Sequence, residues 1–124
     1  MMSMPSPKEA LFIQFAAVAK ALAHAHRLEL LRQSRTGVVT VLDVRPADEF
    51  ALGHLPGAVN IPLRELERRL SGLDPSQQIV AYCRGPYCVL AFEAVALLRK
   101  RGFQARRMQD GFPEWRNAGF PLAC

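Results

Sequence analysis

The sequence has few of the residues that mark secreted or membrane-spanning proteins. Its 124 residues include three cysteines and one tryptophan. So small and odd a number of cysteines cannot build a disulfide scaffold, and it favours a reducing compartment, which predicts a cytoplasmic location. No run reaches about 18 uninterrupted apolar residues, which excludes a spanning helix and predicts no membrane partner.

Enough hydrophobic residues are nevertheless present to fill the core of one domain. Half of the chain (50%) is hydrophobic and 22% is charged, a balance that argues against disorder. The 16 Lys and Arg residues exceed the 11 Asp and Glu residues and give a net charge of +5. This surplus suits either a small anionic substrate or a nucleic acid, and it does not choose between them.

A long helix is predicted near the amino terminus, over residues 8–33. This segment lacks Pro and Gly, is rich in Ala, and lies between two prolines and Gly37, as helices often do. Apolar residues recur along it at helical spacing: Leu11, Phe12, Phe15, Val18, Ala19, Leu22, Leu28 and Leu31. A secretory signal would also be apolar and alanine-rich, but Gln14 and Lys20 interrupt the apolar run, so a helix that stays in the protein is favoured.

Beyond Gly37, short apolar segments alternate with helical ones. The unalternating β-branched run at residues 38–42 is typical of a buried parallel strand. Further strands are predicted at residues 58–60, 79–82 and 104–108, and helices at residues 47–52, 63–70 and 89–101. This alternation predicts an α/β fold, a small and mostly parallel β-sheet flanked by helices, with the amino-terminal helix as an addition.

The segment from Tyr82 to Val89 carries the most chemistry. Cys83 directly follows a predicted buried strand and precedes a long helix, and ligand sites of open α/β sheets lie at this edge. Backbone N–H groups of a tight loop, together with the helix amino terminus, would stabilise a thiolate, the nucleophilic form of cysteine. A buried, inert cysteine is the alternative, since free cysteine is among the most buried residue types.

Two flanking motifs give this cysteine a family context. Residues 42–62 (LDVRPADEFALGHLPGAVNIP) and residues 110–121 (DGFPEWRNAGFP) resemble the two signatures of rhodanese domains, with the cysteine between them in the expected order. The resemblance covers residues 37–122. It implies a small parallel sheet wrapped by helices, and transfer of sulfane sulfur through a cysteine persulfide.

Matched to that family, Cys83 is the residue that bears the persulfide, and the chemistry needs no metal or cofactor. The loop that cradles the outer sulfur corresponds to Arg84, Gly85, Pro86, Tyr87, Cys88 and the amide of Val89. A ring of amides favours an anionic sulfur. Arg84 would attract an anionic sulfur donor such as thiosulfate, with a thiol or cyanide-like acceptor as second partner; a merely solvated side chain is the alternative.

The first signature is interpreted as mostly structural. Asp43, Arg45 and Glu49 are predicted to form a hydrogen-bonded network that supports the strand end and the loop. His54 is expected to fix a turn, and Trp115 to anchor the last helix in the core. The histidines and cysteines show no zinc-like spacing, so no metal site is predicted.

Two loop residues bear on rival activities. Cysteine phosphatases need Cys-x5-Arg, because the guanidinium clamps the phosphoryl oxygens, and Val89 at that position argues against a phosphatase. Cys88 adds a second thiol, whose side chain we expect to pack beneath the loop because a bridge within a tight turn would be strained. The alternative is that Cys88 resolves the persulfide or forms a redox switch with Cys83. Cys124 is expected to be a free, incidental thiol.

The amino-terminal segment resembles a second family. Residues 15–32 (FAAVAKALAHAHRLELLR) are similar to the opening of arsenic-repressor-type winged-helix regulators, some of which carry a rhodanese domain. We therefore divide the chain into a helical extension that is a remnant of such a regulator, residues 1–36, and a rhodanese-like domain, residues 37–124. The strand begins too soon after the helix to leave room for a recognition helix, so specific DNA binding is not expected.

The same resemblance implies a homodimer, because the first helix of these regulators lies at the dimer interface. Its apolar residues also cover more than one face, which a small domain cannot bury alone. As a whole, the sequence predicts a thiosulfate or persulfide sulfurtransferase acting through Cys83. The alternative is a persulfide- or redox-sensing module of a transcriptional regulator with little turnover.

Overall fold

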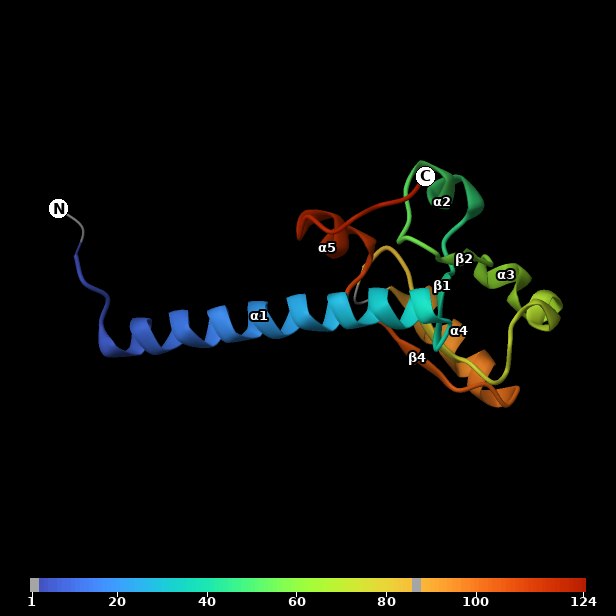
Figure 1. The fold of residues 1–124 in the computed structure, drawn as a ribbon, viewed down its shortest axis with the longest axis horizontal. Helices are drawn as coiled ribbons and strands as arrows, with labels where there is room; N and C mark the ends of the chain where they lie inside the picture. The colour runs from blue at the N-terminus through green and yellow to red at the C-terminus, as the bar shows by residue number, and fades with distance from the viewer. Residues whose placement is uncertain (1–2, 86–87) are drawn as a thin grey trace.

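The computed structural model describes residues 3–85 and 88–124, which form an α/β fold on one parallel sheet (Figure 1). The strands are β1 (Val39–Asp43), β2 (Val59–Asn60), β3 (Gln78–Tyr82) and β4 (Ala105–Arg107), in the order β2-β1-β3-β4. The helices are α1 (Pro7–Thr36), α2 (Ala47–Leu52), α3 (Leu63–Leu66), α4 (Val89–Lys100) and α5 (Phe112–Asn117), and a 3-10 segment, η1 (Glu67–Gly72), follows α3. The predicted fold class, with its additional amino-terminal helix, is confirmed.

The two central strands bring the polar ends of β1 and β3 together. Val39 pairs with Gln78 at one end of the register, and Asp43 pairs with Tyr82 at the other. Both strands are otherwise mostly apolar and mostly buried, as expected for a parallel sheet covered on both faces. Asp43 is therefore held at the carboxyl edge of the sheet, next to the strand that leads into the cysteine loop (residues 83–88).

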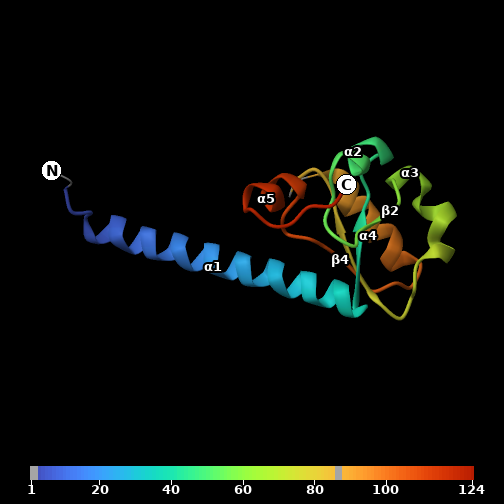
Figure 2. The same cartoon turned by 45° about the horizontal axis from the view of Figure 1, so that its top comes forward.

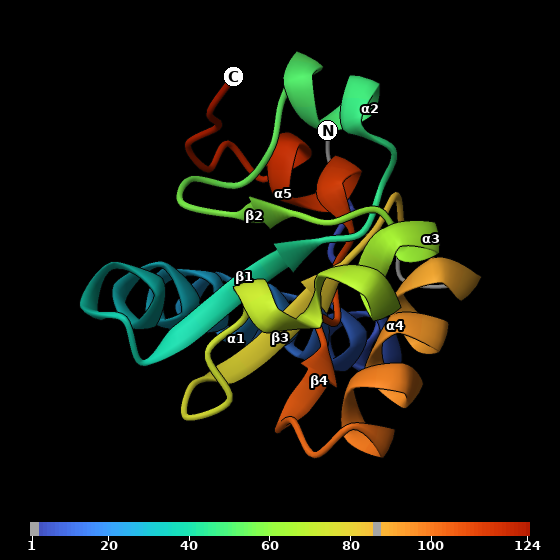
Figure 3. The same cartoon turned by 90° about the vertical axis from the view of Figure 1, so that its right-hand side faces the viewer.

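Helices cover both faces of the sheet (Figure 3). On one face, α3 and α4 supply Leu66, Ala94 and Leu98 to a cluster that includes Leu42 and Ile79. On the other face, a second cluster joins the end of α1 and the single tryptophan of α5 to the sheet, and its members include Leu30, Leu31, Val41, Val80 and Trp115. The last turns of α1 thus pack against the sheet and α5.

Most of α1 projects away from the sheet (Figures 1 and 2). Its start is fixed by a capping box between Ser6 and Glu9, and it ends at Gly37, whose φ of 78° suits glycine. Large apolar side chains along the projecting part are exposed, namely Leu11, Phe12, Ile13, Phe15, Val18 and Leu22. Within residues 3–85 and 88–124, no helix combines the length and the apolar character needed to cross a bilayer.

One predicted element is wrong in detail. The single helix expected over residues 63–70 is a short α-helix, α3, followed by η1, and Arg69 in η1 departs from helical geometry with φ −109° and ψ 16°. Leu66 is fully buried whereas Arg68 and Arg69 are exposed, so the middle of η1 has no core packing to hold it in α-helical geometry. A segment this short gains little from the cooperative α-helical ladder, and 3-10 geometry is common at such ends.

Candidate functional site

Cys83 begins the cysteine loop at the carboxyl edge of the sheet. It directly follows β3, is 1% exposed, and packs in the same cluster as α4. Its carbonyl oxygen accepts a hydrogen bond of 3.0 Å from the N–H of Phe112, which ties the strand end to the start of α5. Reaction and ligand sites of open α/β sheets lie at this edge.

Cys88 ends the loop and lies at the N-cap of α4. Its N–H donates to the carbonyl oxygen of Gly85 at 3.2 Å, and its side chain is half-buried. The sulfur atoms of Cys83 and Cys88 are joined as a disulfide, with the two Cα atoms 6.1 Å apart. The expectation that the Cys88 side chain packs away from Cys83 is therefore wrong, because this Cα separation lies within the range that a disulfide spans.

The remaining loop residues are less uniformly placed. Pro86 and Tyr87, which the sequence assigns to the sulfur cradle, lie outside the described residues. Gly85 is half-buried, and Val89, the first residue of α4, is 61% exposed. The first turn of α4 carries no acidic residue, so the partial positive charge of its amino terminus is not offset by a carboxylate of that turn.

Gly111, a residue that the sequence analysis did not single out, supports the loop from below. A Cβ atom placed on Gly111 would overlap the backbone N and Cα of Gly85 and lie 2.8 Å from the carbonyl carbon of Arg84. Only a glycine allows the two backbones to approach so closely. Its position in the second signature, directly before α5, was the signal that could have identified it.

A buried network lies under the strand ends, next to the loop. The Asp43 carboxylate accepts from the Arg45 guanidinium at 2.7 Å and from its backbone N–H at 2.8 Å. It also accepts from the hydroxyl of Tyr82 at 2.7 Å, and that hydroxyl accepts from the N–H of Leu55 at 3.1 Å. Arg45 donates in addition to the carbonyl of Gly53 at 2.7 Å. Each strong polar group named here thus has a partner away from water.

The network raises the pKa values of both Tyr82 and Arg45. Burial, followed by the charge and hydrogen bond of Asp43, raises the pKa of Tyr82 far above its ordinary value. Burial would lower the pKa of Arg45, but the hydrogen bonds and charge of Asp43 outweigh it and raise that pKa. The sequence missed Tyr82, although a tyrosine at the end of a buried strand needs a polar partner for its hydroxyl.

Glu49, the third predicted member of the network, pairs with the loop instead. Two bonds of 2.7 Å join its carboxylate to the Arg84 guanidinium. The hydrogen bonds from Arg84 lower the pKa of Glu49, and the same contact raises the pKa of Arg84. Arg84 is therefore held at the outer face of the loop by α2, where it remains largely exposed.

Two hollows lie near the carboxyl edge of the sheet. The arginine hollow, about 440 Å³, lies between α2, the loop and α5, and its lining includes Arg84, Arg116, Arg45, Glu49 and Phe112. The apolar hollow, about 300 Å³, is lined by Val44, Pro46, Pro62, Leu63, Arg64 and Leu90. The first offers cationic groups to an anion, and the second offers hydrocarbon surface beside the start of α4.

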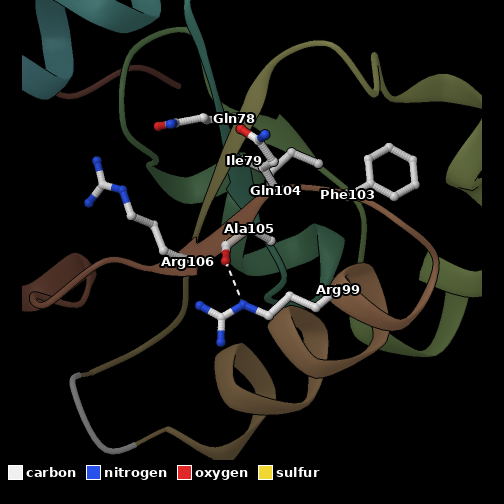
Figure 4. Close-up of a pocket in the computed structure, with 7 residues that line it drawn as sticks. All are labelled: Gln78, Ile79, Arg99, Phe103, Gln104, Ala105 and Arg106. Carbon is white, nitrogen blue, oxygen red and sulfur yellow. Dashed lines mark hydrogen bonds between the residues drawn. The ribbon is translucent and has the colours of Figure 1, made fainter.

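Another hollow, of about 350 Å³, lies at the opposite edge of the sheet. Figure 4 shows its lining residues around the amino ends of β3 and β4, where Arg99 donates a 2.8 Å hydrogen bond to the carbonyl of Ala105. Since Cys83 follows the carboxyl end of β3, this hollow is on the wrong side of the sheet for its chemistry.

The other residues named from the sequence lie outside the loop. The Nδ1 atom of His54 lies 2.8 Å from the carbonyl oxygen of Phe50, and the backbone of His54 bridges to Ala123. Trp115 is fully buried, and its Nε1–H donates to the carbonyl of Pro121 at 2.8 Å. Cys124 is a free, exposed thiol at the carboxyl terminus.

The chain is similar in sequence to known proteins. Residues 26–118 match the family of rhodanese-like domains. A transcriptional regulator of the helix-turn-helix type from Mycobacterium tuberculosis is 52% identical over 96 residues, which are 77% of this chain and 42% of the regulator. A sulfurtransferase from Allochromatium vinosum is 27% identical over 94 residues, or 75% of this chain and 86% of that protein. The chain thus spans less than half the length of the regulator.

Solved structures agree with the sequence matches. A protein from Lactobacillus plantarum superposes with a TM-score of 0.72 at 26% identity, over 90% of this chain and 97% of that one. A rhodanese-related protein from Thermoplasma volcanium gives a TM-score of 0.66 at 26% identity, over 76% of this chain and 90% of that one. With the family match extending over most of the chain and the cysteine loop at the carboxyl edge of a parallel sheet, the chain belongs to the rhodanese-like domain family.

Proposed function

We propose that the chain transfers sulfane sulfur through a persulfide on Cys83. The Cys83 thiolate attacks the outer sulfur of a donor such as thiosulfate, a new S–S bond forms, and sulfite leaves with the electron pair of the broken bond. The persulfide then gives its outer sulfur to a thiol or cyanide, which regenerates the thiolate. The observation that carries the proposal is the position of Cys83, directly after the buried central strand β3 and one loop before α4.

The surroundings of Cys83 favour anionic sulfur. The amino terminus of α4, equivalent to about half a positive charge, begins at Val89, one residue beyond the loop. Such a terminus stabilises a thiolate or a terminal persulfide sulfur without a metal. Sulfur transfer therefore needs nothing from this chain beyond the cysteine and the groups that hold its loop.

The arginine hollow suits the approach of an anionic donor. Arg84 and Arg116 are exposed at its lining, and Glu49 is the acidic residue among its lining groups. Thiosulfate carries two negative charges, so it can compete with the Glu49 carboxylate for Arg84. We propose Arg84 as a donor-binding residue on this basis.

A steady-state assay tests the proposal. Purified, reduced protein is supplied with thiosulfate and cyanide, and thiocyanate is measured over time, with Cys83→Ser as the inactive control. We expect turnover by the native chain and none by Cys83→Ser, whose circular dichroism and unfolding curve should be unchanged. Retained turnover in Cys83→Ser would refute the mechanism.

An intact mass after exposure to thiosulfate gives a second, independent measurement. A chain with the single change Cys88→Ser, which keeps Cys83 as the sole loop thiol, should gain the mass of one sulfur atom, whereas Cys83→Ser should gain none. A gain in mass without steady-state turnover would instead support the rival function below.

A sensing module is the second candidate function. Its support is the identity of 52% to a transcriptional regulator, of which this chain spans 42%. In such a role the state of Cys83 would be reported to other parts of a regulator rather than turned over. Only two residues separate α1 from β1, so a recognition helix has no place between them, and we do not propose specific DNA binding for this chain.

A reducing compartment such as the cytoplasm suits either function. Cys83 reacts as a thiolate, and Cys124 is a free thiol that an oxidising compartment would leave open to intermolecular pairing. We therefore place the protein in such a compartment.

A further inference from the structure

Cys88 is positioned to react with sulfur carried on Cys83. The two residues are five positions apart, yet their Cα atoms are 6.1 Å from each other and their sulfur atoms are bonded. The hydrogen bond from the Cys88 N–H to the Gly85 carbonyl, at 3.2 Å, folds the end of the loop back toward its start. The backbone conformation of the loop therefore allows the two sulfur atoms to come into contact.

The two cysteines differ in access to solvent. Cys83 is 1% exposed in the core cluster, whereas Cys88 is half-buried at the N-cap of α4. A thiol at a helix amino terminus is readily ionised, and thiol–disulfide exchange proceeds through the thiolate. Cys88 can thus act as an attacking group toward the loop interior while remaining within reach of an external reductant.

We propose that Cys88 resolves the Cys83 persulfide and releases its outer sulfur as sulfide, an inference that rests on the proposed function. Cys88 Sγ attacks Cys83 Sγ and forms the Cys83–Cys88 bond. The bond between Cys83 Sγ and the outer sulfur breaks, and the outer sulfur leaves with the electron pair. It takes up the proton of the Cys88 thiol and departs as hydrosulfide. The two cysteine sulfurs are oxidised to a disulfide while the sulfane sulfur is reduced.

A dithiol must then reduce the disulfide to start another cycle. Reduction returns both cysteines to thiols and converts the dithiol to its own disulfide. The sum of the steps is that thiosulfate and a dithiol yield sulfite, sulfide and an oxidised dithiol. The chain would accordingly have two outcomes for the same bound sulfur, transfer to an acceptor when one is present and release as sulfide when none is.

A single-turnover experiment separates the two outcomes. Fully reduced native protein, freed of reductant, is mixed with thiosulfate in the absence of any acceptor, and sulfite, sulfide and intact mass are followed together. Cys88→Ser is the test variant, and Cys124→Ser is the matched control because Cys124 is a free thiol away from the loop. After removal of thiosulfate, cyanide is added to convert any sulfur still held on Cys83 into thiocyanate.

We expect one sulfide per chain from the native protein and from Cys124→Ser, with no thiocyanate on later addition of cyanide. Trypsin cuts after Arg84, so the disulfide should appear as a pair of peptides, one on each side of Arg84, that separate on reduction. Cys88→Ser should release sulfite but no sulfide, keep the mass of one added sulfur, and yield thiocyanate.

The results that overturn the proposal are distinguishable from failure of the sulfurtransferase assignment. Sulfite release with a stable persulfide on the native chain, and no sulfide, would refute resolution by Cys88 and leave transfer through Cys83 in place. No sulfite and no added sulfur in any of the three proteins would overturn both. The measurement on the native chain decides the question even if Cys88→Ser folds poorly.

Discussion

Two arginine–carboxylate pairs flank the cysteine loop, and they differ in the access of water to them. Arg45 and Asp43 contact at 2.7 Å with side chains 4% and 0% exposed. Arg84 and Glu49 also contact at 2.7 Å, but their side chains are 55% and 31% exposed. The distance between the charged groups is the same in both pairs, but their exposure to water differs. Breaking the two pairs should therefore lower the free energy of unfolding by different amounts.

The difference assigns a separate task to each side of the loop. The inner pair is enclosed by Tyr82, Leu55 and Gly53, and its groups cannot exchange partners without leaving a charge out of water. The outer pair can open at little cost, because water replaces either partner. A fixed inner side and an exchangeable outer side are what a loop needs if it holds a reactive sulfur and admits an anion.

The largest effect is expected from breaking the inner pair. Arg45→Met leaves the buried Asp43 carboxylate without its counter-ion and should lower the free energy of unfolding by about 3–5 kcal/mol. The same substitution on the outer side, Arg84→Met, should cost at most about 1 kcal/mol because that pair is exposed. Urea denaturation measures the free energy of unfolding of both variants, which can be compared where the dependence on urea concentration is the same. Equal losses would show that burial does not separate the two pairs.

Gly111→Ala should damage activity more than stability. The added methyl group meets the backbone of Gly85 and Arg84, so the loop must move. A displacement of about 1 Å at a reacting group can cost about 100-fold in rate, and we expect a loss of kcat/KM of that order in thiocyanate formation. Gly72→Ala is the matched control, since nothing lies within 4 Å of its Cβ position. Unchanged activity in Gly111→Ala would mean that the loop can move to accommodate the methyl group without affecting the reaction.

Tyr82→Phe tests the inner side with a smaller change. It removes the hydroxyl that Leu55 and Asp43 share and should cost about 1–3 kcal/mol at neutral pH, measured by urea denaturation. Because the folded protein raises the pKa of Tyr82 above the value of about 10 in an unfolded chain, the native tyrosine keeps its proton when the unfolded one loses it.

The pH dependence follows from that difference in proton affinity. Above about pH 10 the unfolded chain binds fewer protons than the native one, so the stability contributed by Tyr82 falls as the pH rises, by about 1.4 kcal/mol per unit. Phenylalanine cannot ionise, so the stability gap between the native chain and Tyr82→Phe should narrow from pH 9 upward through about pH 11. A gap that widens there would contradict the buried position of the hydroxyl.

The inner and outer sides also differ in how well the sequence predicts them. The alternation of strands and helices was enough for the fold class, because hydrophobic periodicity is local and strong. The hydrogen-bond partners of Asp43 are harder to predict from the sequence, since they depend on which strand lies beside β1. Tyr82 is its register partner in β3, 39 positions along the chain, and the sequence offers no measure of that distance.

Close backbone approach and sulfur contact are likewise tertiary properties. Gly111 must be a glycine because the start of α5 lies against the cysteine loop. No local sequence pattern predicts that contact. For Cys88, the expectation of a strained bridge assumed a tight turn, whereas the observed Cα separation from Cys83 is 6.1 Å. Glu49 was predicted to share a network with Asp43 and Arg45, and in the fold its carboxylate accepts from Arg84 instead. Residues that join distant segments are thus the ones that required the structure.

A weaker effect is expected when the outer pair is changed one charge at a time. Glu49→Gln frees Arg84 for a donor anion and should lower the KM for thiosulfate by up to about fivefold, while Arg84→Gln should raise it to a similar extent. The value of kcat should change less in both. Because these charges are exposed, the differences should shrink as the ionic strength rises to about 1 M. Shifts of KM in the same direction would exclude Arg84 as the donor-binding group.

The smallest effect on stability is expected in the projecting part of α1, where the contrast between inner and outer positions recurs along one helix. Phe12 and Phe15 are exposed in the single chain, so replacing both with Ser should change the free energy of unfolding of the monomer, measured at low protein concentration, by less than about 0.5 kcal/mol per substitution. Leu30→Ala, at a buried position of the same helix, should cost about 2–5 kcal/mol.

Self-association should respond in the opposite order. We propose that the exposed apolar side chains of α1 pair with those of a second copy, so light scattering should give a dimer mass for the native chain and for Leu30→Ala wherever it is folded. The Phe12→Ser and Phe15→Ser double variant should give a monomer mass, because two large apolar side chains leave the surface that would be buried. A monomer mass for the native chain at high concentration would show that the exposed helix face has no partner in a second copy.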